Sequence, residues 1–458
     1  MLQLVDNNGL RNCAGMTRRT ALKAGFLGLL GLSQADLLRL RAESTKPTND
    51  KAVILLWLDG GPSQLETYDP KPDASSDYRG PWGVTQTNVT GIQISEILPH
   101  HARHADKMVF IRSLHHDNGD HFAGAHWMLT GKFGSTAANL PQKFPSVGSY
   151  VARCHGSNNP DLPAYVGLPS AQSVYLFPGY QGSAYLGPAY NPFDVDRVNR
   201  YLAANDTRPV GTPAWLKEFA QEKADLARSR RDLLTAFDTL RRDLDGKGVA
   251  DSLDKYQQQA MNMILGGKAR VAFDLDKEDP KLVDRYGRNP WARYTLMARR
   301  LVEAGVAFVT VDMPNWDDHS NIKEGHAYKL HPLDQAVGAL MDDLQERGLL
   351  DKVLVVVMGE FGRTPKINNG QPGIAIPGRD HWGNAISVMM AGGGLKGGQI
   401  VGKTNSKAEY PVDRALKPAD VLATVYHLLG IDTRQTFKDH TGRPHAILDE
   451  GEPIEEII

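Results

Sequence analysis

Short polar stretches rich in His and Asp contain the side chains of this sequence that could do chemistry. The chain has 15 His residues, and many of them cluster rather than scatter. The polar stretches are residues 59–63, 112–126, 312–321, 359–364 and 378–382. Carboxylate oxygens together with imidazole nitrogens suit a divalent metal such as zinc or manganese, whereas magnesium or calcium favours sites with fewer His. The composition of these stretches therefore indicates a metal site. A polar site that binds no metal is the alternative.

Each stretch alone also has an ordinary structural explanation. An Asp after a strand often caps a helix or a turn, and a single His often packs with a hydrogen bond. The prediction therefore depends on whether the stretches meet at one place in the fold.

The elements that would position them are five nearly continuous apolar runs. Continuous hydrophobicity is typical of strands buried on both faces, as in parallel sheets. The runs are residues 51–58, 108–111, 307–311, 353–358 and 385–391. Helical patterns at 293–304 and 331–348 precede the third and fourth runs, which indicates a doubly wound α/β sheet. Because ligands bind at the carboxyl ends of strands in such sheets, we expect the polar stretches to converge there.

Three other segments complete the predicted organisation. Residues 213–268 are polar and helical in pattern, and they predict a helical insertion packed against the sheet. Residues 140–194 are rich in Gly, Pro, Tyr and Ser, and they predict loops and short strands. Residues 421–429 predict a late helix that ends at Gly430.

Charge and cysteine content exclude several classes of protein. Lys plus Arg number 52 and Asp plus Glu number 53, so nothing indicates a nucleic-acid partner or an anionic membrane surface. With only two Cys, the chain has neither a disulfide framework nor a Cys-based zinc site.

The first 50 residues are predicted to be a targeting segment and linker. The folded domain is predicted to span residues 51–458. Residues 17–23 (TRRTALK) resemble a twin-arginine signal, and a short apolar stretch at 24–32 follows. That stretch is far shorter than the roughly 20 residues needed to span a bilayer. We therefore expect export by the twin-arginine route to the periplasm or cell envelope, with no membrane span in the mature chain. The alternative is an ordinary amphipathic first helix.

Six motifs in order resemble the family called domain of unknown function 1501, a group of exported, sulfatase-like bacterial proteins. The motifs are LLWLDGGPSQLETYDPKP, RSLHHDNGDHFAGAHWMLTG, WDDHSN, GEFGRTPKIN, GRDHW and AGGGLKGGQIVGKT, and the resemblance covers roughly residues 51–445. It implies the fold of alkaline phosphatases and sulfatases, with a mostly parallel central sheet flanked by helices.

The resemblance also implies a set of metal ligands. In that superfamily an Asp after the first strand, an Asp and His after a central strand, and a later His bind metal. Phe361 stands where the superfamily has a ligating His. The matching candidates here are Asp59, Asp317, His319, Glu360 and His381, with Asp380 beside the last.

The usual sulfatase nucleophile is missing from the corresponding motif. Aligning residues 128–131 (MLTG) with the sulfatase pattern places His121 at the nucleophile position and Ala125 where an Arg supports it. Sulfatase chemistry of the usual kind is therefore not expected.

Three functions remain open at this stage. The first is a metal-dependent hydrolase of phosphate or sulfate esters, with attack by water or by His121 and with Arg363 or Arg379 neutralising oxyanion charge. For Arg363 a structural salt bridge is an equal alternative. The second is a non-catalytic binding or scaffold protein of the cell envelope, and its ligand would be an anionic polysaccharide or a partner protein. The third is another metal hydrolase, such as a carbohydrate esterase. The substrate, the metal and the oligomeric state are not specified by the sequence.

Overall fold

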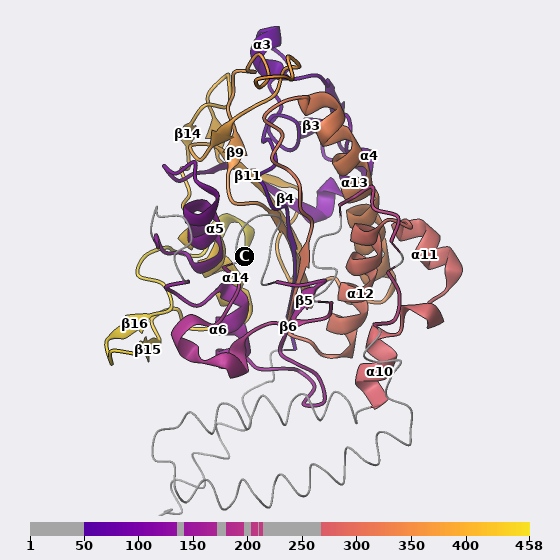
Figure 1. Ribbon diagram of the computed structural model, residues 1–458, viewed down its shortest axis with the longest axis vertical. Helices are drawn as coiled ribbons and strands as arrows, with labels where there is room; N and C mark the ends of the chain where they lie inside the picture. Colours follow the sequence, from indigo (N-terminus) through magenta and orange to yellow (C-terminus); the bar gives the residue numbers. More distant parts are fainter. Residues whose placement is uncertain (1–49, 135–141, 172–179, 197–202, 209, 214–266) are drawn as a thin grey trace, which may run out of the picture. The chain divides into compact units, whose positions relative to one another are not determined.

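A central sheet organises the part of the chain that the computed structural model describes, which is residues 50–134, 142–171, 180–196, 203–208, 210–213 and 267–458. Figure 1 shows the sheet nearly edge-on between two layers of helices. Its strands, in spatial order, are β12 (Gln399–Val401), β4 (Met108–Leu114), β11 (Ile386–Gly392), β8 (Val353–Met358), β1 (Ala52–Trp57), β7 (Phe308–Asp312), β5 (Tyr165–Leu168) and β6 (Phe193–Asp194).

The five predicted strands are confirmed, and so is the mostly parallel α/β fold. Strand β1 pairs in parallel with β7 and β8, and all six of its residues are buried, as a continuous apolar run requires. Strand β11 is antiparallel to both of its neighbours, β4 and β8. Its N-terminal end therefore lies at the same edge of the sheet as the carboxyl ends of the parallel strands.

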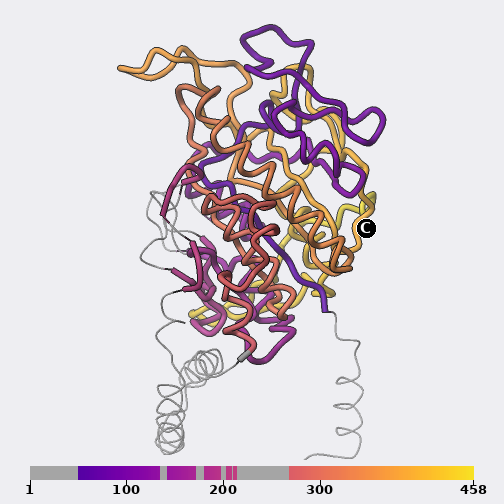
Figure 2. The backbone as a smooth tube through the Cα atoms, turned by 90° about the vertical axis from the view of Figure 1, so that its right-hand side faces the viewer, coloured from indigo at the N-terminus to yellow at the C-terminus, as the bar shows by residue number. Residues whose placement is uncertain are grey.

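Helices cover both faces of the sheet (Figure 1). One layer contains α5 (His121–Thr130), α6 (Val147–Cys154) and α14 (Pro418–Leu428). The other contains α4 (Pro99–Arg103), α10 (Gly267–Phe273), α11 (Pro280–Tyr286), α12 (Pro290–Ala304) and α13 (Ile322–Glu346), and this layer faces the viewer in Figure 2. Two apolar cores, one on each face of the sheet, join these layers to it.

Local sequence explains where the main helices begin and end. The side chain of Asn289 accepts a hydrogen bond from Ala292 N at the start of α12, and Gly305 closes the helix in the left-handed conformation before β7. Helix α13 begins at Ile322, nine residues before the predicted start, and continues through Pro332. Proline usually interrupts a helix, which is why the sequence suggested a later start, but buried residues of the first turns hold α13 together.

The remaining elements are short. Within 140–194 the structure has helix α6 and strands β5 and β6, of which the helix was not predicted. The predicted insertion at 213–268 and the predicted signal at 1–50 lie almost wholly outside the described residues. Four two-stranded sheets complete the fold: β2 (Val84–Gln86) with β3 (Gln93–Ser95), β9 (Gly362–Arg363) with β10 (His381–Trp382), β13 (Lys403–Thr404) with β14 (Pro411–Asp413), and β15 (Thr436–Lys438) with β16 (Pro444–Ala446). Helix α3 (Ser76–Arg79) is a single turn.

Candidate metal centre

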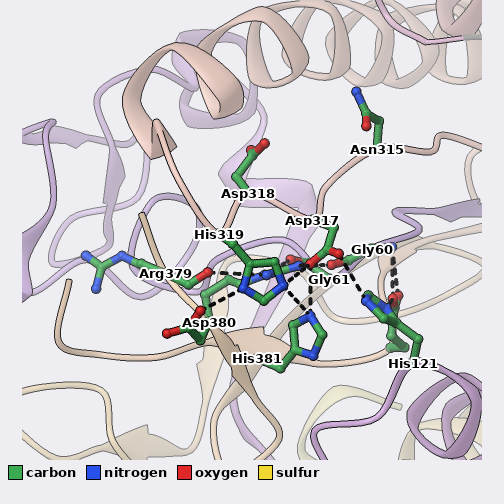
Figure 3. A network of polar contacts seen from close by, with 12 residues as sticks. Gly60, Gly61, His121, Asn315, Asp317, Asp318, His319, Arg379, Asp380 and His381 are labelled. Carbon is green, nitrogen blue, oxygen red and sulfur yellow. Dashed lines mark hydrogen bonds and ion pairs between the residues drawn. The ribbon is translucent and has the colours of Figure 1, made fainter. Parts of the chain in front are cut away.

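The carboxylate of Asp317, in the loop between β7 and α13, is the centre of a polar cluster (Figure 3). Its Oδ1 lies 2.9 Å from His381 Nε2, 3.0 Å from His319 Nε2 and 2.7 Å from Arg363 Nη2. Its Oδ2 lies 3.3 Å from His121 Nε2. One carboxylate therefore gathers three imidazoles from three different elements.

Two of these imidazoles are held by acceptors on their far side. His319 Nδ1 lies 2.7 Å from Asp380 Oδ1, and His381 Nδ1 lies 2.7 Å from the carbonyl oxygen of Gly119. A carbonyl and an ionised carboxylate only accept, so each Nδ1 must donate its proton. In the neutral rings both Nε2 atoms then carry lone pairs, and they lie 2.9 Å apart. This arrangement is typical of metal-binding histidines, whose second nitrogen donates to a carboxylate or a carbonyl.

His121, the first residue of α5, is oriented in the same way. Its Nδ1 lies 2.6 Å from Glu360 Oε1, and Glu360 also accepts the backbone N–H of Gly60 at 2.9 Å. Burial by itself would lower the pKa of His121, but hydrogen bonds with Asp317 and Glu360 outweigh it and raise that pKa to about 10. Glu360, predicted as a ligand, thus contacts the cluster through His121.

The charges of the cluster are mutually stabilised. Burial would raise the pKa of Asp317, but its hydrogen bonds with the three imidazoles and the charge of Arg363 hold that pKa far below the usual range. The hydrogen bond with Asp317 raises the pKa of His319. Asp317 is therefore a permanent negative charge at the centre of the site.

Two side chains of α13 hold the loop that carries Asp317 and His319. His326 Nδ1 and Lys329 Nζ, both on α13, each lie 2.6 Å from Asp318 Oδ2. Both side chains are fully buried. Asp318 was noted in sequence only as part of a polar stretch, and its role in holding the loop depends on the packing of α13.

Arg363 and Arg379 are both fully buried, a placement that favours positioning roles over contact with a substrate. Besides Asp317, Arg363 donates to the carbonyl oxygens of Gly60 and Gly61. Arg379 forms an ion pair with Glu66 at 2.9 Å, and its side chain points away from the imidazoles in Figure 3. The contacts of Arg363 thus match the structural salt bridge named as its alternative, and Arg379 likewise forms a buried ion pair.

Asp59 belongs to a different group of buried carboxyls. Burial, then the charge of Glu360, raises its pKa well above the ordinary value, and Asp59 in turn raises the pKa of Asp312. Asp312 ends β7 and was not among the predicted site residues. Its position directly after the apolar run 307–311 was the available sequence indication.

The residues present fit a divalent metal. Ligand atoms of His121, Asp317 and His381 lie within 4.8 Å of one another, and His319 Nε2 is about 3 Å from two of these residues. Zinc bonds of about 2.0–2.1 Å in a tetrahedron place ligand atoms roughly 3.3 Å apart. The separations between Asp317 and the imidazoles of His121 and His381, 3.3 and 2.9 Å, approach that value.

Fold and site together define an α/β protein with a candidate metal centre of His121, Asp317 and His381, with His319 beside it, at the carboxyl edge of its sheet. The chain belongs to the family described as "Protein of unknown function (DUF1501)", whose model matches residues 50–458. The family resemblance drawn from the sequence is thereby confirmed. No curated protein matches the chain.

Solved structures that resemble the chain include sulfatase and phosphatase types. Ps i-CgsB in complex with k-i-k-neocarrahexaose is 13% identical, with 83% of this chain and 72% of that chain covered and a TM-score of 0.39. The lipoteichoic acid synthase LtaP from Listeria monocytogenes is 11% identical (84% and 73% covered, TM-score 0.37). Alkaline phosphatase from the Antarctic bacterium TAB5 is 14% identical (83% and 98% covered, TM-score 0.37). Likenesses this distant carry no argument about activity.

Among the described residues, no helix has both the length and the apolarity to cross a bilayer.

Proposed function

We propose that this chain is an exported, metal-dependent hydrolase of phosphate or sulfate esters, with zinc or manganese as its metal. The observation that carries the proposal is the convergence of His121, His319 and His381 on Asp317, each imidazole with its Nδ1 held by an oxygen acceptor. Preorganised nitrogen ligands with fixed tautomers cost little to assemble around a cation. A divalent metal at this position supplies Lewis acidity toward an ester oxygen.

The contacts of the same residues indicate what each of them would do in the reaction. Asp317 is held ionised by Arg363, so it can keep a cation in place throughout a turnover. Glu360 holds Nδ1 of His121, and Nε2 faces Asp317 among the other candidate ligands, a position that suits metal binding better than attack on an ester. We therefore propose that water attacks the ester and that His121 binds the metal.

A non-catalytic binding protein of the cell envelope is the second candidate. The burial of Arg363 and Arg379 favours it, because neither guanidinium can contact the anionic part of an ester. Such a protein would hold metal and bind an anionic polysaccharide or small-molecule ester without cleaving it.

Metal analysis and an ester screen on the full chain separate these candidates. We expect at least one equivalent of zinc or manganese and hydrolysis of an aryl phosphate or aryl sulfate. His319→Ala should lose both the metal and the activity, whereas His427→Ala, which alters an exposed His on α14, should keep both. Metal without turnover of any ester favours the binding protein. Unchanged metal content in His319→Ala would exclude the site itself.

Export is proposed from residues 1–50, which lie outside the described part of the chain apart from Asp50. Replacing Arg18 and Arg19 by Lys should retain the protein in the cytoplasm of an expressing bacterium. Equal periplasmic recovery of the variant and the unaltered chain would exclude the twin-arginine route.

A further inference from the structure

A buried aromatic ring closes the inner side of the imidazole cluster. Phe361, between β8 and β9, is fully buried, whereas the side chains of His121 and His381 are 11% and 22% exposed. The centroid of the Phe361 ring lies 4.5 Å from that of His381, stacked at 29°, and 4.9 Å from that of His121. The centroids of the two imidazoles are 4.4 Å apart. The three rings therefore pack as one unit, with Phe361 on the side away from solvent.

The Phe361 ring has little room to move aside. Two glycines lie against its opposite edges: a Cβ on Gly61 would be 2.4 Å from Cδ2, and a Cβ on Gly124 would be 3.3 Å from Cδ1. The buried guanidinium of Arg363 lies over the ring, 5.5 Å from its centroid. Because a close-packed interior transmits such contacts, the surrounding chain holds Phe361 against the imidazoles.

The carbon atoms of Phe361 offer nothing that a metal ion can bind. A buried water needs both room and polar partners, and the ring provides neither. An ion bound to the imidazoles and to Asp317 can therefore add ligands only from His319 or from the solvent side. Manganese prefers six oxygen-rich ligands in an octahedron that surrounds the ion, whereas zinc is satisfied by four in a tetrahedron. The closed inner side thus suits zinc.

We propose that Phe361 determines which metal the candidate centre holds. By closing the inner side of the cluster, the ring restricts the bound ion to roughly four ligands and so selects zinc over manganese. The ring contacts the ligating imidazoles and not the metal, so Phe361 is a specificity-determining residue. The inference rests on the metal centre of the proposed function, but it does not require hydrolysis of an ester.

Co²⁺ serves as the probe of coordination number, because its visible absorption is strong in a tetrahedral site and weak in an octahedral one. The full chain is stripped with a chelator and loaded with one equivalent of Co²⁺. We expect strong absorption in the unaltered protein and loss of most of it in Phe361→Ala, where water can enter beside the imidazoles. Phe361→Leu keeps a bulky apolar side chain and should retain the strong absorption.

Competition titrations then compare the dissociation constants for Zn²⁺ and Mn²⁺ in the same proteins. Phe361→Ala should lower the preference for Zn²⁺ over Mn²⁺ by about 10-fold, because Zn²⁺ binds more weakly and Mn²⁺ does not. Equal losses of affinity for both ions would show that the ring only supports the fold, and they would overturn the proposal. Weak Co²⁺ absorption in the unaltered, zinc-binding protein would also overturn it. This last measurement decides the question even if Phe361→Ala fails to fold.

The results distinguish this inference from the proposed function. A tetrahedral Co²⁺ site and an altered metal preference in Phe361→Ala, without turnover of any ester, uphold the role of Phe361 while the hydrolase function fails. Ester turnover by a protein whose Co²⁺ site is octahedral has the opposite meaning. A folded chain that binds neither Zn²⁺ nor Co²⁺ overturns both.

Discussion

The Nε2 atoms of His319 and His381 lie 2.9 Å apart, although 62 positions separate the two residues in the chain. Each ring donates its Nδ1 proton to an oxygen behind it, Asp380 for His319 and the carbonyl of Gly119 for His381. Both lone pairs therefore point toward each other and toward Asp317. Such a group of acceptors is stable only with a proton or a metal ion among them, which is why we regard it as a cation site.

Asp380 should control metal affinity without being a ligand. Asp380→Ala removes the acceptor that orients His319, and partners of this kind typically contribute 10- to 100-fold to affinity (about 1–3 kcal/mol). We expect a loss in that range in a competition titration of zinc against a chromogenic chelator. Asp117→Ala removes an exposed carboxylate from the polar stretch at 112–126 and serves as the control. Equal zinc affinity in both variants would contradict the orienting role.

Arg363 should stabilise the fold through its hydrogen bonds to Asp317 and to the carbonyl oxygens of Gly60 and Gly61. Arg363→Met leaves a carboxylate and two carbonyls without their buried donor, a change that typically costs about 3–5 kcal/mol. Because Asp317 is 23% exposed, we expect the low end, about 3 kcal/mol, in urea unfolding. The matched control is Arg434→Met, which removes an exposed ion pair and should leave stability nearly unchanged. Comparable losses in the two variants would show that Arg363 does not hold the site.

Gly60 should be irreplaceable because of its contact with the Asp317 loop. Its φ is +107°, and an added Cβ would lie 2.8 Å from the backbone nitrogens of Trp316 and Asp317. Gly91 has a similar φ of +86° but open space around it. Gly91→Ala should therefore report the backbone strain alone, about 1–2 kcal/mol. Gly60→Ala should cost a further 1–3 kcal/mol or so and weaken zinc binding, because the loop must move. The check is urea unfolding of both variants together with the zinc titration, and similar losses in stability would argue against the contact.

His126 should make the protein lose stability in mild acid. Burial lowers the pKa of His126 to about 4, and its Nδ1 bonds to the carbonyl of Lys132. The unfolded chain takes up this proton near pH 6.5, so the contribution of His126 is complete above that pH. It declines as the pH falls from 6.5 to 4, by about 1.4 kcal/mol per pH unit and up to about 3 kcal/mol.

The contribution of His126 is isolated by measuring the free energy of unfolding against pH for the unaltered protein and for His126→Asn. His126→Asn can keep a hydrogen bond to the Lys132 carbonyl but cannot titrate. We expect the free energies of unfolding of the two proteins to converge between pH 6.5 and 4 in urea denaturation. Parallel curves over that range would show that His126 does not titrate as proposed.

The sequence by itself was sufficient for the sheet and for the edge at which the polar stretches gather. Continuous apolar runs such as 51–58 and 353–358 have one stable environment, between two helical layers, and that environment makes strands β1 and β8. Asp317 and Glu360 follow such strands, so the parallel arrangement placed them at one edge. Family membership, too, was evident from motifs spread along the chain.

Only the tertiary structure decided how each polar residue is used. An apolar run buried on both faces reads the same in either direction, so the sequence could not show that β11 runs antiparallel to its neighbours. Because of that reversal, the residues that precede β11 lie at the carboxyl edge of the parallel strands, and His381 of β10 is among them, paired with Arg363 of β9. Likewise Arg379 pairs with Glu66, 313 positions away, rather than facing a substrate. Hydrogen bonds and ion pairs of this kind join residues that meet only after the chain has folded, and no local pattern encodes them.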